Sequence, residues 1–64
     1  MGQGSDVRYS EVAATFARHG WWLARVSGSH HIHTNGTQSF SVPVHNGRVK
    51  RVYCKKIKKI VGGE

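Results

Sequence analysis

Three histidines stand within four residues of this chain, in the segment GSHHIHTNG that covers residues 28–36. Imidazole titrates closest to neutral pH among the side chains, so it can accept and donate protons, and it also binds transition metals. His31 and His33 are two residues apart, so on a strand they point to the same face, which is a known spacing of metal ligands. The segment therefore allows acid–base chemistry or a metal site.

A metal site at these histidines needs further ligands. Structural zinc takes four protein ligands and catalytic zinc takes three. The other candidates are His19, His45 and Cys54, and nothing in their spacing ties them to the histidine segment. We therefore expect no metal and no other cofactor, and the plain alternative to catalysis is an exposed polar strand.

Positive charge dominates the composition. Ten Lys and Arg residues stand against three acids among 64 residues, which gives a formal net charge of +7. Seven of the bases lie within residues 48–59, where there is no acid. Such a field attracts nucleic acid first, an anionic membrane surface second and an acidic protein third. The expected RNA-binding residues are Arg48, Lys50, Arg51, Lys55, Lys56, Lys58 and Lys59.

Two functions fit this combination. RNA cleavage without a metal needs a base for the 2′-OH proton and positive charge near the phosphate, and the chain has both residue types. Non-catalytic binding of RNA or DNA needs only the basic run, and composition alone favours it. A lysine-rich helix can also be a mere solvated face, but the like charges at Lys55/Lys58 and Lys55/Lys59 repel one another unless a partner neutralises them.

Length and cysteine content predict one small domain in a reducing, cytoplasmic setting. A core of this size supplies roughly 3–5 kcal/mol. The single cysteine excludes an intrachain disulfide, and the sequence has neither a signal peptide nor the ~20 apolar residues of a membrane span. We expect a flexible N-terminus at residues 1–7 and a single domain at residues 8–64.

Hydrophobic periodicity predicts the order helix, three strands, helix. The expected N-cap of the first helix is Ser10, Gly20 ends it, and Asn35-Gly36 predicts a hairpin. The helices are expected at residues 9–19 and 48–61, with the apolar side of the second formed by Val49, Val52, Tyr53, Ile57, Ile60 and Val61, and the strands at residues 21–26, 30–34 and 38–44.

Short turns between the strands predict a three-stranded antiparallel sheet with both helices on one face. This is a two-layer α+β fold in the order of double-stranded RNA-binding domains. Phe40, Val42 and Val44 share the core face, and Pro43 marks an edge or the end of its strand. Trp21 and Trp22 could stack on nucleic-acid bases, but we expect instead that one fills the core and one covers its rim.

The segments HGWWLARVSGSHHIHT and FSVPVH, followed by a lysine-rich C-terminal segment, resemble the HicA family of bacterial mRNA interferase toxins. The pattern is a helix ending in Gly20 and an aromatic residue, a Gly-Ser-His motif whose histidine lies ten residues later, and a Val-Pro-x-His segment. The resemblance spans roughly residues 8–62. Its motif residues are Gly28, Ser29, His30, Pro43 and His45.

The resemblance implies the toxin of a toxin–antitoxin pair, an endoribonuclease that cuts mRNA, and a HicB-type antitoxin that occludes the active site. By spacing, the essential histidine is His30, with His31 as the alternative if the register is off by one. Strand parity places His30 on one face with Ile32, the expected core face. The charge of +7 predicts an acidic antitoxin whose binding weakens as salt rises.

The second helix departs from the family pattern. Many members carry a Gly-Thr step at its start, where the threonine can cap the helix, but this chain has Val52-Tyr53. We therefore expect the cap from Asn46, or a helix that starts earlier.

Overall fold

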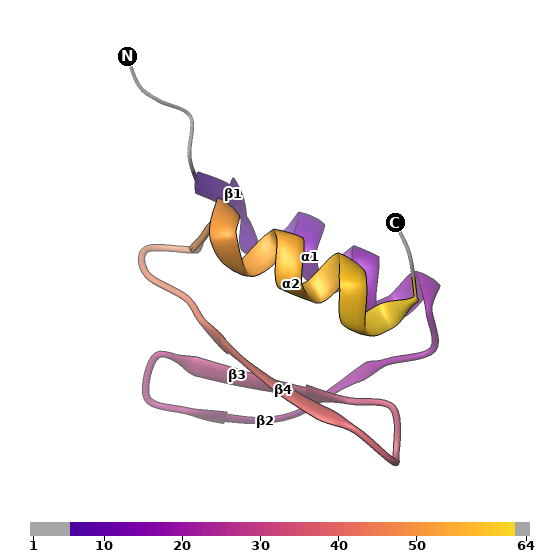
Figure 1. The fold of residues 1–64 in the computed structure, drawn as a ribbon. Helices are drawn as coiled ribbons and strands as arrows, with labels where there is room; N and C mark the ends of the chain where they lie inside the picture. The colour runs from indigo at the N-terminus through magenta and orange to yellow at the C-terminus, as the bar shows by residue number, and fades with distance from the viewer. Residues whose placement is uncertain (1–5, 63–64) are drawn as a thin grey trace.

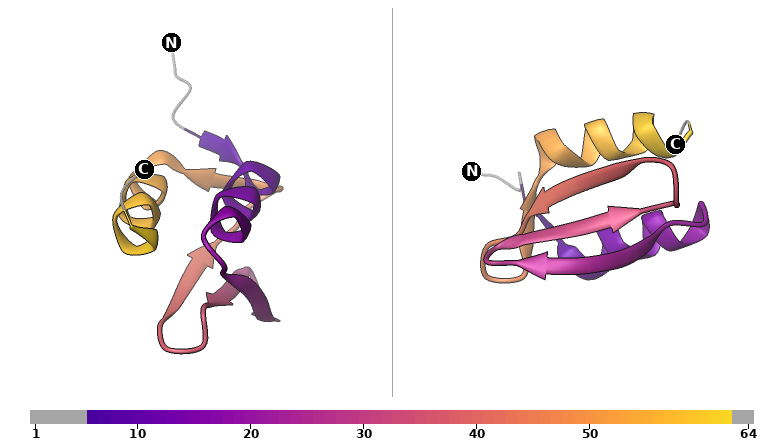
Figure 2. Two further views of the ribbon diagram at one scale, coloured as in Figure 1. Left: turned by 90° about the vertical axis from the view of Figure 1, so that its right-hand side faces the viewer. Right: turned by 90° about the horizontal axis from the view of Figure 1, so that it is seen from below.

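The computed structural model describes residues 6–62, which form two helices and five strands in two layers (Figure 1). Strands β2, β3 and β4 form an antiparallel sheet in that order, and both helices lie over one of its faces (Figure 2). The predicted two-layer α+β fold is confirmed. The elements are β1 (Asp6–Arg8), α1 (Tyr9–Arg18), β2 (Trp22–Ser27), β3 (His30–Thr34), β4 (Ser39–Pro43), β5 (Arg48–Lys50) and α2 (Arg51–Val61).

A second, two-stranded sheet joins β1 to β5, and the sequence patterns did not predict it. Val7 pairs with Val49, and each strand runs directly into a helix, so the ladder ties the starts of α1 and α2 together. Residues 48–50, predicted as the first turn of the second helix, are therefore extended. Asp6 and Val7, expected within the flexible terminus, belong to β1, whereas residues 1–5 lie outside the described residues.

This ladder also explains why the predicted helix caps are wrong. The N-cap positions are Arg8 and Lys50, which have extended backbones and make no side-chain capping hydrogen bond. Ser10 lies inside α1. Asn46 instead adopts φ 54° beside Gly47 at φ 72°, as a tight two-residue turn requires. The end of a strand, not a polar side chain, sets where each helix begins.

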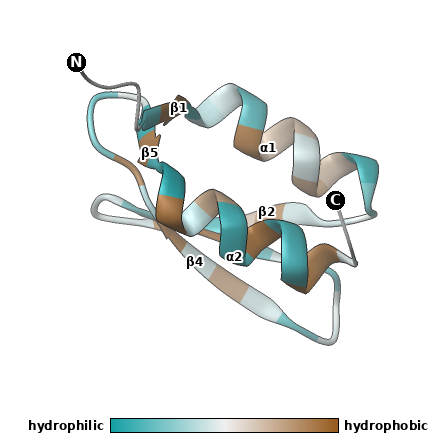
Figure 3. Ribbon diagram, turned by 45° about the horizontal axis from the view of Figure 1, so that its top comes forward, coloured by the Kyte–Doolittle hydropathy of each residue, from teal (hydrophilic) through white to brown (hydrophobic). Residues whose placement is uncertain are grey.

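The core lies between the two layers. Phe40 and Val44 pack against it and Trp21 is buried in it, as predicted, whereas Trp22 is exposed. Val52 is 54% exposed, which corrects its predicted place on the apolar side of α2, because five residues from Ile57 is the opposite side of a helix. Figure 3 shows polar and apolar residues alternating along α2. The buried apolar residues are Val12, Phe16, Trp21, Val42, Val49 and Ile57.

Two valine-to-alanine substitutions test the extended β5. Val49 is 0% exposed and Val52 is 54% exposed, although both were predicted on one apolar helix face. We expect Val49→Ala to lower the free energy of unfolding by about 2 kcal/mol, because it removes two buried methyl groups and leaves a cavity. Val52→Ala should change it by less than about 0.5 kcal/mol. Urea unfolding followed by circular dichroism measures both, and equal losses would contradict this assignment.

Candidate active site

Successive side chains of β3 point to opposite faces of the sheet, so the clustered histidines are divided between the two faces. His33 is buried and pairs with Phe40, and His31 pairs with Val42, so both point toward the helices. His30 and Ile32 therefore lie on the opposite face of the sheet. This reverses the prediction that Ile32 marks the core face. The apolar face of β4 fixes the parity of β3, and the imidazoles of the core face pack against α1.

His33 is a structural residue. It is 2% exposed, its ring stacks on that of Phe16 with centroids 4.3 Å apart, and a 2.8 Å hydrogen bond joins its Nε2 to the Tyr9 hydroxyl. Burial raises the pKa of Tyr9, so its hydroxyl stays protonated and can donate. Burial, and to a lesser extent the neighbouring His31, lowers the pKa of His33. This imidazole is therefore held neutral within the core.

His31 is half-buried beside the same tyrosine. Its ring centroid lies 4.5 Å from that of Tyr9. Its Nδ1 is buried and has no hydrogen-bond partner within residues 6–62, as is also true of the Nδ1 of His33. His31 and His33 share a face, as their spacing predicts, but that face is the packed one. Among residues 6–62, no three His, Cys, Asp or Glu side chains are grouped so that they could hold a metal ion.

His30 is exposed at the first position of β3. It pairs with Ser27 of β2 on one side and with Pro43 of β4 on the other. Gly28, just before it, adopts φ 60°, and a Cβ there would meet no atom within 4 Å. The glycine therefore serves the β2–β3 turn, where its positive φ favours a residue without a Cβ. The Val44 N–H donates to the Ser29 carbonyl at 2.7 Å, which extends the ladder past Pro43.

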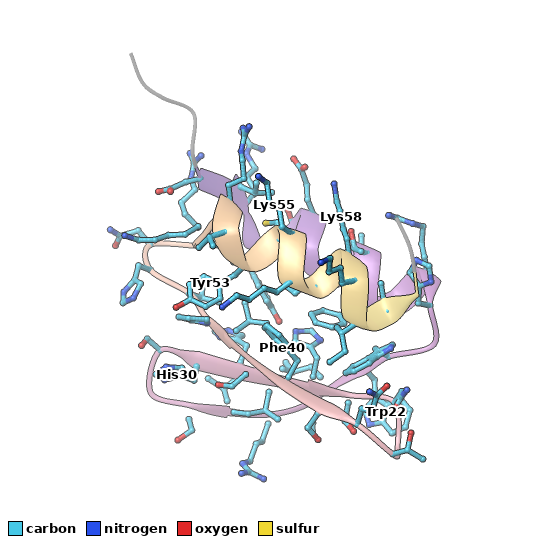
Figure 4. The ribbon with its side chains drawn as sticks, in the orientation of Figure 1. Trp22, His30, Phe40, Tyr53, Lys55 and Lys58 are labelled. Carbon is cyan, nitrogen blue, oxygen red and sulfur yellow. The ribbon has the colours of Figure 1, made fainter. Side chains whose placement is uncertain are left out.

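His30 belongs to a face of the sheet that the helices leave uncovered, which we call the open face (Figure 2). His30 and Trp22 lie near its two ends (Figure 4), about 13 Å apart along the strands at 3.3 Å per residue. The open face contains no acid. Its nine residues, in three cross-strand rows, are Trp22, Thr34 and Ser39; Arg25, Ile32 and Ser41; and Ser27, His30 and Pro43.

A bulge in β2 brings Trp22 and Arg25 onto the open face together. They are three positions apart in the chain, so a regular strand would place them on opposite faces. The register shifts between Leu23 and Arg25, with the result that Trp22 pairs with Thr34 and Arg25 with Ile32. Strand alternation alone does not reveal a bulge, and for this reason sequence reasoning missed Arg25.

The structure does not gather the basic helix around His30. Lys55 and Lys58 project from α2 away from the sheet (Figure 4). The ammonium group of Lys56 lies 5.6 Å from the centre of the Tyr53 ring, a cation–π contact within α2. Arg48 and Lys50 are exposed on β5, and Arg51 and Lys59 are exposed on α2. These cations therefore belong to β5 and α2, whereas His30 belongs to the main sheet.

A groove of about 390 Å³ lies between the two helices. Burial raises the pKa of the Cys54 thiol there, against the opposing effect of Lys58 and Arg51, so the thiol stays protonated. A protonated thiol is a poor nucleophile and a poor metal ligand. The groove is lined by Val7, Glu11, Val12, Ala14, Thr15, Arg18, Cys54, Ile57 and Lys58.

The fold and the charge define the class of protein. It is a small basic α+β domain whose main sheet of three strands lies between its two helices in the chain. The family model described as HicA toxin of bacterial toxin-antitoxin matches residues 9–62. The chain therefore belongs to the HicA toxin family, whose members are toxins of toxin–antitoxin systems and pair with a cognate antitoxin. No curated protein and no solved structure matches the chain. Neither helix in residues 6–62 is long and apolar enough to span a membrane.

The burial of His33 predicts that stability falls in acid. The unfolded chain takes up a proton near the ordinary histidine pKa of about 6.5. The folded chain takes it up only at lower pH. The free energy of unfolding should therefore decrease as the pH falls below about 6.5, by at most about 1.4 kcal/mol per pH unit for this proton. Urea titrations between pH 7.5 and pH 5 measure this slope.

Two variants assign the slope to His33. His33→Phe keeps a flat ring beside Phe16 and removes the titrating group, so its stability should vary less with pH. Tyr9→Phe removes the same hydrogen bond but keeps the imidazole, so it should retain the dependence. An unchanged slope in His33→Phe would show that other groups cause the effect.

Proposed function

We propose that this toxin is a metal-independent endoribonuclease that cuts mRNA in the cytoplasm, with His30 as the general base. One observation carries the choice of residue: of the three clustered histidines, His30 alone is exposed and lies on the open face. His31 is half-buried against Tyr9, and His33 is bonded to that residue inside the core. A base that must reach a ribose hydroxyl has to be accessible to RNA.

The proposed step transfers the 2′-OH proton to a neutral imidazole nitrogen of His30. The 2′-oxygen attacks the adjacent phosphorus, and the bond from phosphorus to the 5′-oxygen breaks. Water supplies the proton that the leaving 5′-oxygen needs, and the products are a 2′,3′-cyclic phosphate and a 5′-hydroxyl. His31 is the alternative base, which requires the Tyr9 packing to open.

The open face provides a path for the RNA. Trp22 presents an exposed aromatic ring on which a base can stack, and Arg25 lies one cross-strand row from His30, within reach of a phosphate. The absence of acids from this face avoids repulsion of the phosphate backbone. This path uses side chains of the sheet that carries the base.

The basic residues of the helix layer have a different part in this proposal. Lys55 and Lys58 point away from the sheet, so they act on RNA outside the cleavage site and through the long-range field of a +7 protein. We propose that the seven cations attract the RNA and hold its flanking phosphates, and that a HicB-type antitoxin is the partner that blocks this activity. The seven are Arg48, Lys50, Arg51, Lys55, Lys56, Lys58 and Lys59.

Replacement of His30 tests the base. We expect His30→Ala to lower the rate of RNA cleavage by about 10²–10⁴-fold, since general base catalysis typically contributes that much. The fold should persist, because the side chain is exposed. Free imidazole should restore part of the activity of His30→Ala if the lost group is a proton acceptor. Cleavage of a defined RNA and growth arrest on expression are the two measurements.

His31→Ala is the comparison for this experiment. If His31→Ala abolishes cleavage while His30→Ala does not, and both are folded by circular dichroism, then the base is His31. Full cleavage and full growth arrest in both variants would exclude the mechanism.

Non-catalytic nucleic-acid binding is the second candidate, and the outward projection of Lys55 and Lys58 favours it, because such cations bind phosphates away from any base. Incubation of the purified chain with RNA in EDTA separates the functions. We expect cleavage to continue in EDTA, since the proposed step uses no ion. Retained binding with intact RNA, with or without EDTA, would support a binding module, and cleavage that stops in EDTA would point to a metal.

A further inference from the structure

Strand β2 is an exposed edge of the main sheet. The order β2–β3–β4 leaves one side of β2 without a neighbouring strand among residues 6–62. All six of its residues, Trp22 to Ser27, are exposed. Three of them are large apolar residues that are about half exposed, namely Trp22, Leu23 and Val26. This is an unusual concentration of apolar surface on one short segment.

Proteins protect such edges, because the unpaired N–H and C=O groups can pair with another chain. Lysines, prolines, very short strands and bulges are the usual protection. β2 has six residues, no lysine and no proline, and its protection is limited to Arg25 and the bulge beside it. The other edge strand, β4, contains Pro43 and buries Val42. β2 is therefore the edge of the main sheet at which an additional strand can pair.

We propose that an extended, acidic segment of the cognate antitoxin pairs with β2 as an additional strand of the sheet. Strand addition gives affinity through main-chain hydrogen bonds, and alternate side chains give specificity. Leu23 and Val26 pair with His33 and His31 and so lie together on the helix side of β2, where they can pack against alternate residues of the added strand. The proposal rests on the toxin–antitoxin family, and not on the proposed ribonuclease activity.

The net charge of the chain indicates which molecule supplies the strand that is added to β2. A second copy of this chain would bring another +7 to the edge, and its β2 would present a second Arg25. Like charges at an interface disfavour association, whereas an acidic partner is attracted and oriented by the same field. The chain has a cognate antitoxin as partner, because it belongs to the HicA family. An acidic segment of that antitoxin therefore fits β2 better than self-pairing.

The position of β2 also connects this edge to His30. Ser27 of β2 pairs with His30 of β3. Strands in a sheet lie about 4.8 Å apart, so an added strand would lie about 10 Å from β3 and would border the open face beside the imidazole. An antitoxin bound there narrows the path to His30 from the β2 side without contacting the histidine itself.

Two valine-to-lysine substitutions test the proposal. Val26 on β2 is 51% exposed and Val52 on α2 is 54% exposed, and each substitution adds one positive charge to the chain. The probe is the protein encoded by the reading frame next to this one, co-expressed with the full chain and then titrated against it. We expect Val26→Lys to weaken the complex by at least about tenfold and Val52→Lys by less than about threefold. Isolated Val26→Lys should cleave RNA like the unsubstituted chain.

Hydrogen exchange of the same complex tests the main-chain pairing. In the complex, alternate amides of residues 22–27 should become protected, since every second N–H of an edge strand points outward. Equal weakening by both substitutions, or protection confined to α2, would overturn the proposal. So would a dimer of the isolated chain that Val26→Lys dissociates, because a second copy would then occupy the edge. Failure of the neighbouring protein to bind the unsubstituted chain would overturn it as well.

These outcomes are independent of the ribonuclease proposal. If Val26→Lys weakens the complex while the unsubstituted chain leaves RNA intact, the docking proposal stands and the cleavage proposal fails. If the unsubstituted chain cleaves RNA and both variants bind the neighbouring protein equally well, the cleavage proposal stands and the docking proposal fails.

Discussion

The hydrogen bond between the Tyr9 hydroxyl and His33 holds the two layers of this protein in register. Tyr9 is the first residue of α1, and His33 lies near the end of the middle strand, 24 positions later in the chain. Phe16, about two turns further along α1, stacks on the same imidazole. An apolar side chain at position 33 would leave the half-buried Tyr9 hydroxyl without this partner, which is costly in a small core.

This interaction and the apolar face of β4 favour the same parity of β3, and that parity determines which imidazole reaches solvent. With His33 fixed against α1, strand geometry places His31 on the same side and His30 on the other. The three histidines thus have three environments within one strand: a core residue, a half-buried neighbour and an exposed residue. The pleat of β3 alone gives the three histidines these different environments, although their side chains are chemically identical.

Much of the fold could be predicted from the sequence, because local patterns report local structure. The stripe of Val12 and Phe16 defined α1, and the spacing of Phe40 and Val42 defined the inner face of β4. The prediction failed where two patterns coincide: Val49 fits a helical stripe, but its pairing with Val7, far away in sequence, makes it a strand residue. Strand pairing over such separations leaves no local signal.

The sequence predicted two candidate histidines for the site, but not the side chains that surround them. The Gly-Ser-His motif indicated His30 or His31, and the turn geometry of Gly28 explains why a glycine precedes them. The accompanying side chains depend on an irregularity: the bulge of β2 decides that Arg25 accompanies Trp22 on the open face. The position of the α2 lysines relative to His30 was not predictable either, since a run of charge in sequence does not report the direction in which a helix presents it.

The β1–β5 ladder has a consequence for the order in which the chain folds. It pairs Asp6 with Lys50, whereas each hairpin of the main sheet joins segments that are close neighbours in sequence. Closing the longer loop costs more chain entropy, so the hairpins form early and the ladder forms late. During synthesis β1 and the backbone N–H of Tyr9 therefore find their partners only after β5 and the turn before it have been made, later than the hairpins of the main sheet.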